Sequence, residues 1–272
     1  MNDDPLNPYA SPSLPAESVW DDQPPQVENR FVDAFSIGTW LLRKHFLLIV
    51  VIVAIVWIPI NLWLSYYELF VIEEDDFSKY FRMTMAMEGL FGVVGAGAIL
   101  AVGKIRLNDG TPTLSQAFGE SVSQWGRFVI GGILSNILIS VGLVCLVLPG
   151  IYISTCLIYF MPVLIVERMS LTDTFKRCFV VGRRRFWFSL GLMLSMVLLP
   201  LLAGVVTGLA SLALSLLELP LNVTWITNAM LTLPDDLVVA WCWLVTLAAY
   251  YRLRTELAAE TADEDVPTEA VA

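Results

Sequence analysis

The sequence has only one histidine, His45, and four cysteines among its 272 residues. A single histidine cannot build the common histidine-rich zinc sites, and no serine is accompanied by a recognisable His and Asp partner. The cysteines form no CxxC pair and no metal-binding spacing, so we interpret them as small apolar residues in helices. No P-loop, HExxH, G-x-S-x-G or strand-linked GxGxxG motif is found either. We therefore expect no enzyme activity, no metal and no cofactor.

Charge is also scarce. Charged residues make up 15% of the chain, and the run from Phe128 to Val166 contains none. This run is too long for one membrane crossing, which takes about 20 residues, and long enough for two. Pro149 cannot continue a helix that ends at Leu148, and Gly150 permits the positive φ of a tight turn. We therefore predict a transmembrane hairpin that turns at Pro149-Gly150. The alternative, two core helices in a soluble globule, fits poorly with a chain that is 57% hydrophobic.

The net charge of −10 comes mainly from the ends of the chain and one loop, and it argues against nucleic acid as a partner. Residues 1–28 are rich in proline and polar residues, and residues 255–272 form a second acidic segment. Neither segment has enough apolar residues to fold, so we predict two disordered tails around a membrane domain at 29–254.

Six membrane spans are expected in this domain. They lie at about 46–66, 88–103, 128–148, 151–166 and 186–208, and a last one ends near Tyr251. Every Lys and Arg except Lys79 and Arg82 then falls on one side of the membrane. Basic residues mark the cytoplasmic side, so we predict that both termini are cytoplasmic and that loops 67–87 and 218–234 face outward. The expected location is the bacterial cytoplasmic (inner) membrane.

A similar stretch precedes each hairpin. The stretches "NRFVDAF", "PTLSQAF" and "MSLTDTF" align with a helical spacing of 4, 7 and 11 residues. Capping residues precede the second and third copies, Thr113 with Gln116 and Ser170 with Asp173, and basic residues follow all three. The aligned positions are Phe31, Leu114 and Leu171; Phe35, Phe118 and Phe175; Gly38, Ser121 and Cys178; and Leu42, Trp125 and Gly182. The fold class predicted is thus all-α and integral to the membrane, with six transmembrane helices as three hairpins. A cytoplasmic amphipathic interfacial helix precedes each hairpin, in units 29–104, 112–167 and 169–254.

Few polar residues are candidates for a site. An ionisable residue inside a membrane is a functional candidate by default, and Asp235 and Asp236 shorten the uncharged part of the last span. We hold two interpretations open for them, an interfacial structural role and a buried functional one. Together with Asn136 and Thr155 they are the candidate polar site in the membrane. The candidate contacts for lipid headgroups are Arg127, Arg183, Arg184 and Arg185, and the candidate structural pair is Glu167 with Arg168, facing the basic cluster 183–185.

Four segments resemble one family of bacterial membrane proteins. They are "LNDGTPTLSQAF", "LPGIYI", "MPVLIVERMSLTDTFKRCFVVGRRRFW" and "AAYYRLR". The chain from about 30 to 256 is similar to the membrane domain attached to some glycerophosphoryl diester phosphodiesterases and to related inner-membrane proteins. The positions that match the family pattern are Pro149, Gly150, Pro162, Glu167, Tyr250, Tyr251 and Arg254. The resemblance implies a six-span membrane module linked to lipid metabolism or envelope upkeep. It does not imply phosphodiesterase activity, because the catalytic domain of the fused relatives has no counterpart here.

Two functions are therefore weighed. The first is a non-enzymatic module that binds membrane lipids or another membrane protein. The alternative is a transporter or channel for a lipid or a small apolar solute. A structure distinguishes the two functions. A transporter or channel predicts that Asn136, Thr155 and Asp236 converge on a water-filled axis, and a binding module predicts that they point apart.

Overall fold

The computed structural model describes residues 29–71, 77–216 and 220–264, so the expected tail at 1–28 lies outside the described residues. Within these ranges the chain is almost entirely helical and contains no strand. The helices are α1 (Arg30–Lys44), α2 (Phe46–Phe70), α3 (Phe77–Met87), the π-helix η1 (Glu88–Gly92), α4 (Val93–Leu107), α5 (Leu114–Cys145), α6 (Val147–Leu157), α7 (Phe160–Glu167), α8 (Leu171–Arg184), α9 (Phe186–Ser215), α10 (Leu221–Leu231) and α11 (Leu233–Glu264).

Six helical stretches are long and apolar enough to cross a membrane. Each of the six spans expected from the sequence overlaps one of them, which makes the chain a helical multi-pass membrane protein. The stretches are Phe46–Glu68, Ser78–Leu107, Leu114–Cys145, Val147–Glu167, Phe186–Leu214 and Val223–Glu260.

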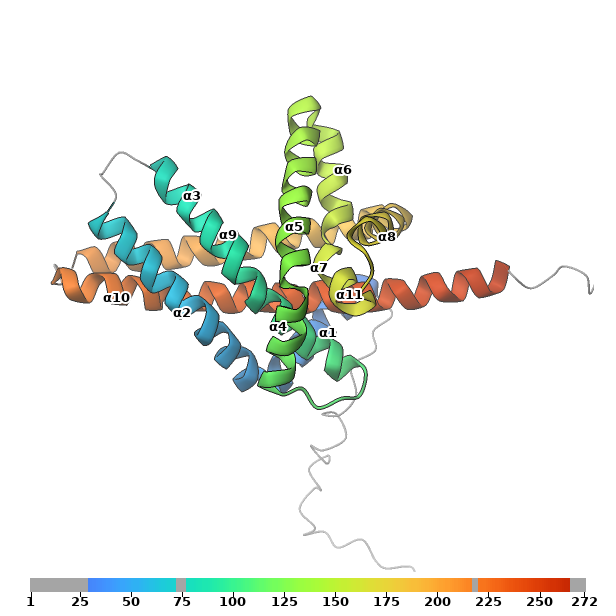
Figure 1. The fold of residues 1–272 in the computed structure, drawn as a ribbon, viewed down its shortest axis with the longest axis horizontal. Coiled ribbons are helices and arrows are strands. Elements are labelled where there is room, and N and C mark those ends of the chain that lie inside the picture. The colour runs from blue at the N-terminus through green and yellow to red at the C-terminus, as the bar shows by residue number, and fades with distance from the viewer. Residues whose placement is uncertain (1–28, 72–76, 217–219, 265–272) are drawn as a thin grey trace, which may run out of the picture.

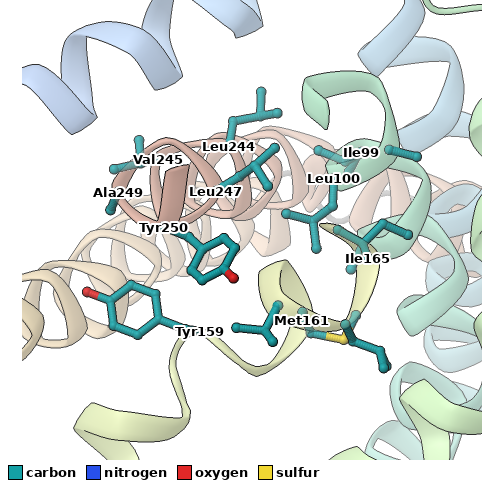
Figure 2. Packing of buried hydrophobic residues seen from close by; sticks show 14 of the residues in the cluster. Ile99, Leu100, Tyr159, Met161, Ile165, Leu244, Val245, Leu247, Ala249 and Tyr250 are labelled. Carbon is teal, nitrogen blue, oxygen red and sulfur yellow. The ribbon is translucent and has the colours of Figure 1, made fainter. Parts of the chain in front are cut away.

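Consecutive stretches pack in pairs that spread from a common centre. In Figure 1, α5 and α6 project toward the top, α9 runs from beside α8 to the left, where α10 lies, and α3 points to the upper left. Helices α4, α7 and α11 pack together at the centre, and Figure 2 shows their buried side chains in contact. Leu100 of α4, Ile165 of α7 and Leu247 of α11 have no exposed surface there. The core thus lies where the three pairs join.

Helix α9 is the most exposed of the six stretches, with only 6% of its most apolar window buried. Large apolar side chains cover its open surface, including Leu201, Val206 and Leu209. An apolar surface of this length is unfavourable in water and favourable against lipid chains. Its exposure is therefore the expected property of a lipid-facing helix.

A helical segment precedes the first span of each pair, and it packs on the second span of another pair. The order is circular: the segment of the first pair packs on the third pair, that of the second on the first, and that of the third on the second. Helix α1 packs on α11, the first part of α5 packs on α4, and α8 packs on α6. Small residues allow the close approach: Gly38 lies against Val245, and Gly182 lies against Cys156. In the second copy the hydroxyl of Ser121 donates a 2.6 Å hydrogen bond to a backbone carbonyl of α4. Gly38 and Ser121 occupy equivalent positions of the aligned stretches, and Gly182 lies four residues after the equivalent position of its own copy.

The helix starts follow local capping rules. Thr113 and Gln116 form a reciprocal capping box at the start of α5, and the hydroxyl of Ser170 accepts from the backbone of Asp173 at the start of α8. The first copy is capped as well, by the side chain of Asn29, which the sequence did not indicate. The copies differ at their ends: α1 and α8 are separated from the following span, whereas α5 continues without a break into the third span.

The predicted turn at Pro149-Gly150 is wrong in position. Helix α5 ends at Cys145, Leu146 is extended, and α6 begins at Val147, so both residues lie in the first turns of α6. Proline fits there because the first backbone N–H groups of a helix have no intrahelical partner. Gly150 does not adopt a positive φ. A Cβ at this position would lie 2.7 Å from the backbone nitrogen of Leu143, so its absence lets α5 and α6 approach closely.

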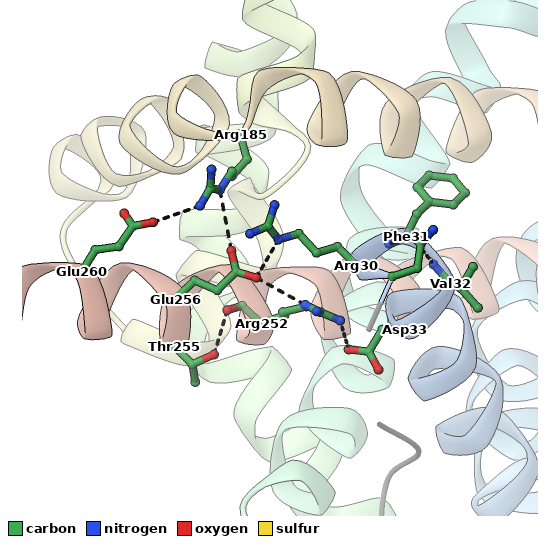
Figure 3. Close-up of polar contacts among 10 residues, drawn as sticks. Arg30, Phe31, Val32, Asp33, Arg185, Arg252, Thr255, Glu256 and Glu260 are labelled. Carbon is green, nitrogen blue, oxygen red and sulfur yellow. Dashed lines mark hydrogen bonds and ion pairs between the residues drawn. The ribbon is translucent and has the colours of Figure 1, made fainter. Parts of the chain in front are cut away.

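The expected boundary of the C-terminal tail at 255 is also wrong, because α11 continues to Glu264. Ion pairs hold this extension (Figure 3): Glu256 lies 2.8 Å from Arg30, and Glu260 lies 2.9 Å from Arg185. Acidic residues that were assigned to a solvated tail therefore bind basic residues of α1 and of the α8–α9 junction. Further pairs in this network are Arg252–Asp33, Arg252–Glu256 and Arg184–Glu260.

Candidate functional site

A cavity of about 540 Å³ lies between the three pairs of spans. All six stretches contribute to its lining, from Trp57 on the first to Thr246 on the last. The lining is mainly apolar, and its sulfur-containing and aromatic members include Met161, Met193 and Trp243. A concave, mainly apolar space with a few polar groups is the usual form of a small-molecule site.

Two of the four predicted polar residues meet at this cavity. Asn136 of α5 and Asp236 of α11 both line it. Thr155 does not: its side chain is fully buried, and its hydroxyl donates a 2.7 Å hydrogen bond to the carbonyl of Ile151 one turn earlier. Asp235 lies outside the lining and accepts from the hydroxyl of Thr207 on α9. The four residues therefore do not form one polar site.

The position of Asp236 is fixed from the first span. The side-chain amide of Asn61 donates a 2.8 Å hydrogen bond to its carboxylate. Because Asp235 binds α9 and Asp236 binds α2, the two adjacent carboxylates attach the start of α11 to two different pairs of spans. They serve as structural contacts, and Asp236 in addition faces the cavity.

Sequence reasoning did not select Glu88, which stands at the predicted start of the second span, as a candidate site residue. In the structure Glu88 starts the π-helix η1 and lines the cavity together with Asp236. Short π-helical segments occur preferentially at functional sites, where they redirect side chains. The signal available in the sequence was the position of Glu88 directly before the glycine-rich run of the second span.

One buried polar group in the lining has no partner. Ser135 of α5 is 9% exposed, and its hydroxyl makes no hydrogen bond among the described residues. The other hydroxyls of the lining behave differently, since Ser154 and Thr246 donate to carbonyls of Gly150 and Cys242 in their own helices. Ser135 is therefore the one described hydroxyl of the lining that is free to bind a ligand.

A second polar cluster lies at the end of the bundle where α1, α8 and the C-terminal part of α11 meet, which we call the basic end. Glu167 accepts from the hydroxyl of Tyr250 and lies 3.4 Å from Arg177 and 3.8 Å from Arg254. The expected pairing of Glu167 and Arg168 with the cluster 183–185 is therefore wrong. The chain turns sharply at Arg168, which has a positive φ and points to another partner.

That partner is Glu120 of α5. Arg168 lies 3.0 Å from one of its carboxylate oxygens, and Lys104 lies 2.9 Å from the other. The amide of Asn108 donates to the hydroxyl of Tyr251 at 3.2 Å close by. Sequence positions that carry the family resemblance, among them Glu167, Tyr250, Tyr251 and Arg254, thus come together at the basic end as structural contacts.

The four predicted headgroup contacts divide into two kinds. Arg184 and Arg185 are bound to carboxylates of α11, with Arg184 at 2.6 Å from Glu260. Arg127 and Arg183 are exposed on the surface. Of the four, only Arg127 and Arg183 therefore remain candidates for headgroup contacts.

Within the described ranges, no three His, Cys, Asp or Glu side chains are grouped so that they could hold a metal ion. Comparisons with protein-family models, with curated proteins and with solved structures found no match. The resemblance to the membrane domain of glycerophosphoryl diester phosphodiesterases stays a prediction.

Proposed function

We propose that this protein is a non-enzymatic membrane module that binds a lipid or another amphiphile in the cavity between its three pairs of spans. The observation that carries the proposal is the lining itself, which draws on all six spans and is apolar apart from a few polar groups. An amphiphile can enter such a site from the bilayer with little loss of apolar contact. The polar members of the lining then fix its orientation.

The same geometry supports the proposal of an internal threefold repeat of hairpins, each preceded by an amphipathic helix. The circular packing of α1 on α11, α5 on α4 and α8 on α6 is the arrangement that three equivalent units around one axis produce. A repeat of this kind places the cavity on the shared axis. It accounts for the contribution of every span to one site.

We place the protein in the bacterial cytoplasmic membrane with both termini in the cytoplasm. The basic end gathers most of the Lys and Arg residues, as expected for a cytoplasmic surface. Arg127 of α5 and Arg183 of α8 are exposed and are the proposed contacts for anionic headgroups. The family resemblance adds a suspected role in lipid metabolism or envelope upkeep.

Native mass spectrometry of the protein, extracted from its own membrane in mild detergent, tests lipid binding. The blocking variant is Gly132→Leu, because Gly132 lines the cavity and a Cβ there meets no atom within 4 Å. The control is Gly204→Leu on the lipid-facing side of α9, where a Cβ also meets no atom within 4 Å. We expect a retained amphiphile in the wild type and in Gly204→Leu, and its loss in Gly132→Leu.

A parallel pair of variants separates the cavity from the surface. Arg127→Gln together with Arg183→Gln should remove weakly held anionic lipid and leave the ligand of the cavity in place. A bare protein under all conditions would contradict the proposal. Retention that is unchanged in Gly132→Leu would place the bound lipid elsewhere and would contradict the cavity as its site.

Transport is the second candidate, and one observation favours it. Asn136 and Asp236 come from different pairs of spans and yet line the same cavity, as expected for an alternating-access site. Flux of a fluorescent lipid across proteoliposomes, lost in Gly132→Leu and kept in Gly204→Leu, would support transport. Retained ligand without flux would favour the binding module.

A further inference from the structure

We propose that the ligand of the cavity is a lipophilic cation, a molecule whose positive charge is attached to bulky apolar groups. The inference rests on the proposed function and names the class of ligand for the same site. The charge of the lining points to it first. Glu88 and Asp236 are the charged residues that line the cavity, and no Lys, Arg or His is found in the lining among the described residues.

The two acidic side chains come from different spans and line the same cavity. Two like charges in a poorly hydrated space are costly, and a cation between them removes that cost. The carboxylates do not depend on each other for placement. Glu88 is set by the π-helix η1, and Asp236 is held by the amide of Asn61. Both acidic side chains are therefore held in position before a ligand arrives.

Ser135 is the second, independent indication of a ligand. A hydroxyl that is nine-tenths buried without a hydrogen-bond partner loses free energy unless something binds it. Its oxygen is an acceptor for an N–H donor and a dipole for a charge without hydrogens. An ammonium group in the cavity would donate a hydrogen bond to the Ser135 oxygen, and a quaternary cation would interact with the dipole of the hydroxyl.

The apolar part of the lining suits the body of such a molecule. Trp57 and Trp243, together with Phe128 and Phe160, line the cavity, and the faces of aromatic rings attract cations in a poorly hydrated space. Three methionines, Met161, Met193 and Met196, also line it. Methionine side chains are flexible and polarizable, so they adapt to apolar groups of different shape. The site should therefore accept several lipophilic cations.

Two probe ions of the same shape and opposite charge test the inference. Tetraphenylphosphonium and tetraphenylborate are added to the full chain in phosphatidylcholine nanodiscs, and binding is measured by calorimetry against empty nanodiscs. We expect saturable binding of the cation and at least tenfold weaker binding of the anion. Glu88→Gln and Asp236→Asn should each weaken binding of the cation at least about fivefold. Asparagine at 236 keeps an acceptor for Asn61, so the contact between α2 and α11 is retained in that variant.

The matched control is Glu68→Gln, which removes a carboxylate at the end of the first stretch that does not line the cavity. It should bind the cation as the wild type does. Equal binding of both probes, or cation binding unchanged in both carboxylate variants, would overturn the inference. Absence of cation binding while a neutral lipid is still retained and is lost in Gly132→Leu would overturn the ligand class and leave the proposed function standing. Absence of both would overturn both.

Discussion

The side-chain amide of Asn61 lies 2.8 Å from the carboxylate of Asp236, and this hydrogen bond joins the first span to the last beside the cavity. Both residues belong to stretches that cross the membrane, so water does not readily replace a lost partner. Hydrogen bonds between membrane helices contribute roughly 0.6–1.7 kcal/mol in double-mutant cycles. The contact is strong enough to test directly.

A double-mutant cycle with Asn61→Ala and Asp236→Ala should give a coupling free energy in that range, about 0.6–1.7 kcal/mol. Each single variant loses the bond and leaves one polar group unpaired, whereas the double variant removes both groups. The measurement is reversible unfolding in detergent for all four proteins. Strictly additive effects would show that the two residues are not bonded in the folded protein.

Gly38 is required for the close packing of α1 on α11. A Cβ at this position would lie 2.8 Å from the Cα of Val245, which cannot move without the helix. We expect Gly38→Ala to lower the free energy of unfolding by about 1–3 kcal/mol, the usual cost of overpacking. At the open position Gly204 the same change should be neutral or stabilise by up to about 1 kcal/mol, because alanine favours the helix. Equal effects at the two positions, in thermal unfolding, would contradict the tight contact.

Local features of the fold could be predicted because their signals are contained in short segments. The six stretches follow from runs of apolar residues, and the caps at Thr113 and Ser170 follow from residues three positions apart. The turn at Pro149-Gly150 was misplaced because proline stops one helix or begins another with equal ease. Packing of α5 against α6, which involves Leu143, decides between the two and is not encoded locally.

The candidate site was predictable only in part for the same reason. Asp236 is a candidate from the sequence because it is a charge in a span, and in the structure it lines a cavity. Glu88, at the predicted start of the second span, was not selected because its spacing gives no indication of which way a π-helix turns it. The role of Glu256 and Glu260 depends on α11 continuing beyond the membrane, and the i,i+4 spacing after Arg252 was the only local sign of it.

Chemical labelling of the four natural cysteines tests the proposed topology. Cys145 is exposed at the end of α5, whereas Cys156, Cys178 and Cys242 are buried. Burial also raises the pKa of the Cys178 thiol at the basic end, which makes it a poor nucleophile. A membrane-impermeant maleimide added to intact cells should therefore modify the wild-type protein at Cys145 alone, from outside.

The control for this experiment is Cys145→Ser, which should abolish labelling while the amount of protein in the membrane is unchanged. Mass spectrometry of the labelled peptide identifies the modified residue. Labelling of Cys145 only after the membrane is permeabilised would place the turn between α5 and α6 in the cytoplasm. The proposed orientation of both termini would then be reversed.

His45, between α1 and α2, gives the chain a pH dependence of known sign. Burial, followed by the charges of Arg106 and Lys44, lowers the pKa of His45 below its usual value. The ring is therefore neutral in the folded protein at pH values where the unfolded chain already binds a proton. Because the unfolded state then binds more protons, stability is full above the unfolded pKa and falls as the pH drops below it.

We expect the melting temperature of the wild type to fall between pH 7.5 and pH 5.5 by more than that of His45→Gln. Glutamine keeps a polar side chain at the junction and does not titrate, so carboxylates that titrate in the same range affect both proteins equally. The difference between the two pH profiles isolates the histidine. A steeper loss of stability in His45→Gln would mean that the charged ring stabilises the fold, and that Arg106 and Lys44 do not act on it as the structure indicates.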